Sequence, residues 1–205
     1  MIHLVSAALT ESAAALDALR RNDATLTAIA AAGAALATAF RAGGRVFCCG
    51  NGGSLCDAMH FAEELSGRYR EDRPALPAQA ISDPGHLTCV GNDYGYDRVF
   101  ARYVEAHARA GDVLLAISTS GTSTNVVRAA AEARSRGVTV LALTGRTASP
   151  LGQLADIEVC TPAGRYADRV QELHIKVIHI LIELVERELF SAPDAGHASA
   201  QQAIA

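Results

Sequence analysis

Short apolar runs alternate with longer amphipathic stretches along most of the chain. These runs lie at residues 45–49, 77–81, 112–118, 138–144 and 156–160. Each has the length of a strand, and the stretches between them have helical character. Strands that alternate with helices predict a parallel sheet with helices on both faces. We therefore expect an α/β fold, a three-layer αβα sandwich of the flavodoxin or Rossmann type with a five-stranded parallel sheet.

Helical periodicity dominates the two ends of this pattern. Residues 4–42 are rich in Ala and Leu, contain no proline, and place apolar side chains at helical spacing up to the Gly43-Gly44 pair, which predicts one or two leading helices. A second periodic segment, 168–189, predicts one long amphipathic helix. The predicted organisation is an N-terminal helical extension for oligomerisation, a main domain and a disordered tail, with boundaries 1–42, 43–190 and 191–205.

Composition narrows the classes of partner. The 205 residues carry a net charge of −4, so no basic surface for nucleic acid is expected. There is no run of about 18 apolar residues and no signal-peptide pattern, so we expect a cytoplasmic protein with no membrane partner. The five cysteines are odd in number and show no CxxC spacing, which predicts reduced thiols in the core.

Two turns rich in glycine and hydroxyl side chains follow two of the predicted strands. The turn CGNGGS (49–54) lacks the spacing of a dinucleotide fingerprint and the lysine of a Walker A loop, and Ser54 is expected to cap the next helix. The turn STSGTS (118–123) offers four hydroxyls and backbone N–H groups without a positive charge. Ligands of parallel sheets lie at the carboxyl ends of strands, where helix N-termini attract anions. Both turns could hold a phosphate, or they could be ordinary capped turns.

Histidines and a glutamate form a second candidate for chemistry. His60 and Glu64 lie four residues apart, which places them on one helix face, where they could bind a metal, exchange protons or form an ion pair. His179 lies in VIHILI without another polar group, so it needs a buried partner, either a backbone carbonyl or a functional group. His174, on the same helix, is predicted to lie at the surface or in an interface.

Five motifs in order carry a family resemblance. They are CGNGGSLCDAMHFAEELSGRYR, HLTCVGNDYGYDRVFARYVE, ISTSGTSTNVVRAA, VLALTG and RVQELHIKVIHILIELVE. Over residues 10–190 the chain closely resembles the phosphoheptose isomerases of the sugar isomerase (SIS) fold. The resemblance implies interconversion of sedoheptulose 7-phosphate and D-glycero-D-manno-heptopyranose 7-phosphate, the first step toward nucleotide-activated heptose. It also implies a homotetramer with sites at subunit boundaries.

The resemblance also implies roles for single residues. One Zn²⁺ ion per subunit would be held by His60, Glu64, Gln171 and His179. In a proton transfer through an enediol, Glu64 would be the base and His179 the acid. The sugar phosphate would be bound by Asn51, Gly52, Gly53, Glu64, Asn92, Asp93, Ser118, Thr119, Ser120, Ser123 and Gln171, with Asp168 and Arg68 nearby. Thr122 and Gly85 depart from the family pattern, where Asn and often Ser stand, which leaves phosphate and sugar contacts open.

Three alternatives follow from the same residues. Gln171 and His179 are separated by about 12 Å along one helix, so they either reach toward each other along a groove or bind a metal shared between subunits. A non-catalytic SIS-fold tetramer that binds the bacterial replication initiator would use the same scaffold. An aldose-ketose isomerase of another sugar phosphate would use the same chemistry.

Overall fold

A five-stranded parallel sheet forms the centre of the molecule. The computed structural model describes residues 1–190, so the predicted disordered tail lies outside the described residues. The strands are β1 (Val46–Cys49), β2 (Ala78–Ala80), β3 (Val113–Ser118), β4 (Thr139–Thr144) and β5 (Ile157–Cys160). They pair in the order β2-β1-β3-β4-β5, all in parallel. Each predicted strand is confirmed to within one residue.

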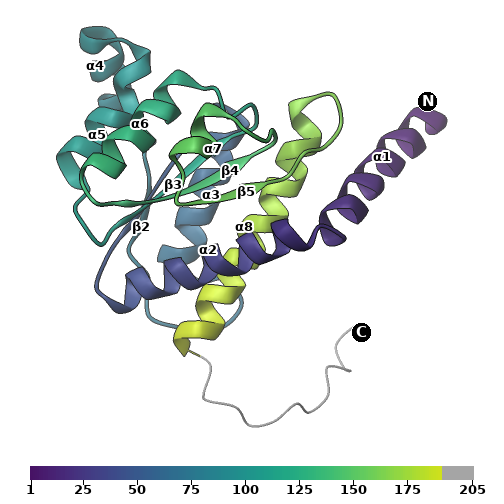
Figure 1. Cartoon of the computed structure of the whole chain (residues 1–205), viewed down its shortest axis with the longest axis horizontal. Coiled ribbons are helices and arrows are strands. Elements are labelled where there is room, and N and C mark those ends of the chain that lie inside the picture. The colour runs from purple at the N-terminus through teal and green to yellow at the C-terminus, as the bar shows by residue number, and fades with distance from the viewer. Residues whose placement is uncertain (191–205) are drawn as a thin grey trace.

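Helices cover both faces of this sheet (Figure 1). They are α1 (Ile2–Arg20), α2 (Asp23–Arg41), α3 (Gly53–Ser66), α4 (Pro84–Tyr94), α5 (Val99–His107), α6 (Thr124–Ser135), α7 (Pro150–Leu154) and α8 (Ala167–Phe190), with a 3-10 turn at Tyr96–Arg98. The α2, α3 and α8 helices pack on one face, and α4 to α7 pack on the other. The predicted three-layer sandwich is confirmed.

Each strand supplies both layers of the core. In β1, Val46 and Cys48 point into the cluster shared with α2, α3 and α8, whereas Phe47 and Cys49 point into the cluster under α5 and α6. This alternation follows from the two-residue period of a strand. Because both faces are covered, the strands read as continuous apolar runs rather than as alternating ones, which is the pattern that the sequence shows.

The leading segment forms two helices with different surroundings. The α2 helix is capped by Asn22, whose side chain accepts a hydrogen bond from the Thr25 amide, and it packs Ile29 and Leu36 into the core. The α1 helix extends away from the sheet and leaves apolar residues such as Leu9 exposed (Figure 1). By length and composition, both helices could cross a membrane, contrary to the sequence argument against such a span. The absence of a membrane partner therefore stays a prediction.

Three local predictions are wrong. His174 is fully buried rather than at the surface, and its Nε2 lies 3.2 Å from the carbonyl oxygen of Thr144. The cap position of α3 is occupied by Gly52, so Ser54 lies inside the first turn and caps nothing. All five cysteines are free, as expected, but Cys56 and Cys89 are exposed and therefore do not belong to the core.

Candidate active site

The two glycine- and hydroxyl-rich turns meet where the strand order changes direction. From β1 the chain continues outward to β2, then returns to β3 on the other side of β1, and such a switch opens a crevice at the carboxyl ends of the two strands. Asn51, after β1, and Asn125, in the first turn of α6, exchange two side-chain hydrogen bonds of 2.9 and 2.8 Å. The buried Asn125 thus fixes one turn against the other.

The turn after β3 holds its hydroxyl groups in a compact arrangement. Ser118 Oγ lies 3.0 Å from Ser123 Oγ and accepts a hydrogen bond from the Gly121 amide. Ser120 Oγ accepts hydrogen bonds from the amide and the hydroxyl of Thr122, at 3.2 and 2.9 Å. Hydroxyls and amides at the N-terminus of a helix are suited to hydrogen-bonding a phosphate.

Three side chains from two helices converge on one point. His60 and Glu64, on α3, have Nε2 and Oε1 3.6 Å apart, as their spacing predicts. His179, on α8, brings its Nε2 to 2.9 Å from His60 Nε2. One ligand atom from each residue lies within 4.8 Å of the others, which is the arrangement of a metal site. Imidazole nitrogens and a carboxylate oxygen are ligands that suit a divalent transition metal.

The surroundings of the two histidines fix their rings. Glu63 lies 3.1 Å from His60 Nδ1, on the side away from the cluster. Tyr69 stacks on His179, with ring centres 5.7 Å apart and an angle of 27° between the planes. The pKa of His179 is lowered from its ordinary value, chiefly by burial and next by the nearby His60. A neutral imidazole has a free lone pair, so it can bind a metal or accept a proton.

Gln171, on α8, lies against the start of α3. A Cβ atom added at Gly53 would lie 2.6 Å from its Nε2 and 2.9 Å from its Oε1, so any larger residue there would displace this amide. Within residues 1–190, no hydrogen bond joins Gln171 to His60, Glu64 or His179. The amide thus faces the glycine turn.

Within residues 1–190, the remaining predicted site residues make no hydrogen bond to this cluster. Asn92 and Asp93, at the end of α4, hydrogen-bond to each other at 2.8 Å. Asp168, in the first turn of α8, accepts from the Arg169 amide, and Arg68 is an exposed residue after α3. In the described part of the chain, none of these side chains hydrogen-bonds to the other predicted site residues.

The two departures from the family pattern are exposed residues. Thr122 hydrogen-bonds to Ser120 within the turn after β3. Gly85 lies in the first turn of α4, where Asp83 caps the helix by accepting from the His86 amide.

The sequence reasoning missed the charge around the hydroxyl-rich turn. A cavity of about 190 Å³ is lined by Thr119 and Ser120 of the turn together with Arg146 and Arg165. The two arginines come from the loops after β4 and before α8, so the turn contains no cation of its own but faces two. The meeting of separate loops at one end of the sheet is the signal that could have found them.

Comparison with known proteins identifies the family. Residues 9–145 match the SIS domain. The phosphoheptose isomerase of Escherichia fergusonii is 56% identical over 186 residues, which cover 91% of this chain and 97% of that protein. The chain belongs to the phosphoheptose isomerases. The corresponding enzyme of Salmonella paratyphi B is 57% identical over the same share of this chain.

Solved structures of phosphoheptose isomerases share the whole fold. The enzyme from Francisella tularensis has a TM-score of 0.86 at 34% identity, covering 91% of this chain and 98% of its own. The enzyme GmhA from Neisseria gonorrhoeae has a TM-score of 0.81 at 38% identity, covering 90% and 97%. The family expected from the five motifs is confirmed, and with it the assignment as an aldose-ketose isomerase.

Proposed function

We propose that this phosphoheptose isomerase interconverts sedoheptulose 7-phosphate and D-glycero-D-manno-heptopyranose 7-phosphate, the first step toward nucleotide-activated heptose. The observation that carries the proposal is the convergence of His60, Glu64 and His179 on one point, together with two phosphate-suited turns at the same end of the sheet. A binding protein would not need such a cluster. The replication-initiator binding protein is therefore the weaker candidate.

The reaction moves a proton between C1 and C2 of the sugar through an enediol, so it needs a base at carbon and an acid at oxygen. Glu64 is the proposed base, since its carboxylate is largely shielded from solvent and points toward the two imidazoles. His179 is the proposed acid, because its ring lies in the same cluster as Glu64 and is held by stacking on Tyr69. Two groups on separate helices can approach the two carbons from different sides.

The turns would hold the substrate for this transfer. The phosphate would be bound by the hydroxyls and amides of the turn after β3 and by Arg146 and Arg165 across the cavity. The proposed sugar-phosphate contacts are Asn51, Gly52, Gly53, Asn92, Asp93, Ser118, Thr119, Ser120, Ser123, Gln171, Asp168 and Arg68. Anchoring the phosphate at one end leaves the C1 and C2 carbons to be oriented at the His60 cluster.

The donor set fits zinc. His60, Glu64 and His179 offer two nitrogens and one oxygen, and Gln171, from α8, is the proposed fourth ligand. A Zn²⁺ ion bound there would supply Lewis-acid polarisation of the substrate carbonyl. The protein's own contribution is to hold His179 and Glu64, which come from separate helices, close together beside the substrate.

We further propose a cytoplasmic homotetramer, assembled through residues 1–42, with residues 43–190 as the isomerase domain. Ile2, Leu4, Val5 and Leu9 are exposed on α1, and burial of such a face against other copies would stabilise an oligomer. Within residues 1–190, Asn92, Asp93 and Arg68 make no hydrogen bond to the cluster, which fits sites completed by a neighbouring subunit.

The test is conversion of sedoheptulose 7-phosphate by the purified, zinc-loaded protein, followed by NMR, beside fructose 6-phosphate. We expect turnover of the heptose only. The variant Glu105→Gln serves as control for Glu64→Gln, because Glu105 is a carboxylate on α5 that pairs with Arg102 and not with the cluster. Turnover of fructose 6-phosphate alone would favour an isomerase of another sugar phosphate. Loss of turnover in every preparation, with folded protein, would favour the binding-protein alternative.

A further inference from the structure

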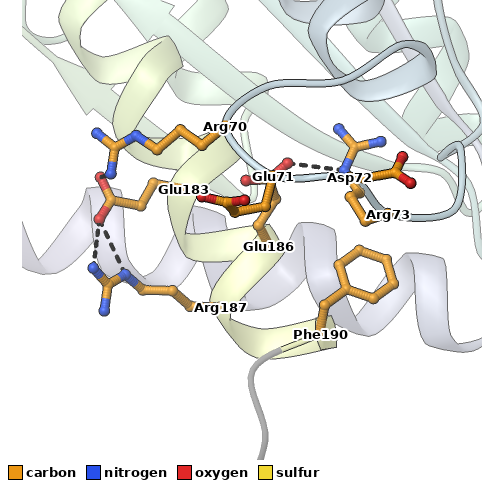
Figure 2. A pocket seen from close by; sticks show the side chains of 8 residues that line it. All are labelled: Arg70, Glu71, Asp72, Arg73, Glu183, Glu186, Arg187 and Phe190. Carbon is orange, nitrogen blue, oxygen red and sulfur yellow. Dashed lines mark hydrogen bonds and ion pairs between the residues drawn. The ribbon is translucent and has the colours of Figure 1, made fainter.

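The loop between α3 and β2 runs along the last turns of α8. Three of its side chains contact α8 at successive turns: Tyr69 stacks on His179, Arg70 pairs with Glu183 at 3.1 Å, and Arg73 pairs with Glu186 at 2.8 Å. Figure 2 shows the two arginines on opposite sides of the loop, each directed at a glutamate of α8. The loop is thereby fixed along the helix that carries His179.

Arg73 differs from the other charged residues of this loop because its side chain is buried. Only 4% of its side chain is exposed. Its Nη2 donates to the carbonyl oxygen of Glu64 at 2.6 Å, and its Nη1 donates to those of Leu65 and Gly67 at 2.7 and 3.1 Å. The last carbonyls of a helix have no partner inside it, so one guanidinium here closes the end of α3.

The same guanidinium therefore joins α3, which carries Glu64, to α8, which carries His179. Through its Nη atoms it holds the backbone of Glu64, and through its Nε it is bound to Glu186 on α8. Glu186 lies seven residues, or two helical turns, after His179. A shift of α3 along α8 would break these bonds, and it would also change the distance between Glu64 and His179.

We propose that Arg73 is a positioning residue for the isomerase: it holds Glu64 at the distance from His179 that proton transfer and metal binding need. The inference rests on the proposed function, since it assigns Arg73 a role through Glu64. Residues that orient the ligands of a metal typically contribute a factor of 10 to 100 in metal affinity or activity. Arginine suits this task because its planar fork donates in several fixed directions at once, whereas lysine presents a single head group.

The cavity beside these residues does not offer a competing role as a ligand site. It has a volume of about 320 Å³ and is lined by Arg70, Arg73, Glu183, Glu186, Arg187 and Phe190, with Glu71 and Asp72. Glu183 binds both Arg70 and Arg187, and Glu186 binds Arg73 (Figure 2). Each of the three arginines at its wall is thus paired with a glutamate, which favours a structural brace over the binding of an anion.

The first test is Arg73→Lys, measured as kcat, KM and the zinc dissociation constant from chelator competition. Lysine keeps the charge beside Glu186 but cannot reach all the carbonyls. We expect kcat to fall by about 10- to 100-fold with KM unchanged, and the zinc dissociation constant to rise by about 10-fold. Arg41→Lys is the matched control, since Arg41 also donates to a carbonyl and a carboxylate of α8, those of Glu188, but within residues 1–190 its side chain bonds to no carbonyl of α3. It should leave all three quantities unchanged.

A second variant covers the case in which Arg73→Lys does not fold. Glu186→Gln leaves Arg73 on the carbonyls of α3 and weakens only its link to α8, and it should lower kcat and zinc affinity in the same direction. Unchanged kcat and zinc affinity in either folded variant would overturn the proposal, as would a loss that follows KM alone. Zinc affinity is measured without substrate, so a wild-type protein that binds zinc but does not isomerise the heptose would count against the proposed function and not against the brace.

Discussion

His174 gives a prediction about stability that the structure allows us to work out. It is fully buried, and burial lowers its pKa from 6.5 to about 4, although a hydrogen bond to the Thr144 carbonyl opposes part of that shift. The unfolded chain therefore binds a proton below pH 6.5 that the folded chain does not bind until about pH 4. The stability that this neutral histidine provides above pH 6.5 is lost as the pH falls through that window. The loss is about 2 kcal/mol between pH 7.5 and pH 5.

The assay is urea unfolding of the wild type and of His174→Gln at both pH values, at one protein concentration. Glutamine can still donate to the Thr144 carbonyl but does not titrate. Burial also raises the pKa of Asp57 to about 6, so this group makes the fold more stable as the pH falls. Asp57 is present in both proteins, so its contribution cancels when the wild type is compared with the variant. We expect the difference in free energy of unfolding between wild type and variant to shrink by about 2 kcal/mol on acidification. Parallel curves would refute the reasoning.

Two further predictions separate the site from the scaffold. Gly53→Ala places a methyl group against the Gln171 amide, the movable end of a side chain, so kcat/KM should fall while the melting temperature stays within a few degrees; a large drop in melting temperature would contradict this. Asp112→Ala removes a buried carboxylate that accepts from the amides of Arg45 and Arg109 and from the Arg45 guanidinium. It should cost about 2 to 4 kcal/mol of unfolding free energy without changing kcat, as followed by urea unfolding and steady-state kinetics.

The strands could be predicted because their sequence pattern follows from one condition, burial on both faces of the sheet. Strands covered on both faces are apolar over most of their length, and residues 113–117 show this for β3, which is buried at every position. The spacing of four residues between His60 and Glu64 predicted that they share one face, because helix geometry places such residues one above the other. Neither inference needed knowledge of how the helices pack.

The errors have physical causes as well. His174 lies between Val170 and Val177 on the buried stripe of α8, so its position in the helical period indicates burial. The prediction that this polar residue lies at the surface or in an interface was therefore wrong. The start of α3 falls at Gly53 because Gly52 takes a positive φ of 54°, which the pattern of adjacent glycines could not specify. The approach of His179 to His60 depends on the packing of α8 against α3 and could not be read from spacing.

The most direct test of the central claim is the exchange of solvent deuterium into sedoheptulose 7-phosphate, followed by NMR, with wild type and Glu64→Gln, before and after zinc removal by a chelator. The account predicts deuterium at the exchanging carbon with the zinc-loaded wild type, at least about 100-fold slower exchange in the folded Glu64→Gln variant, and loss of exchange after chelation. Exchange at the wild-type rate in Glu64→Gln would contradict the role of Glu64 as base.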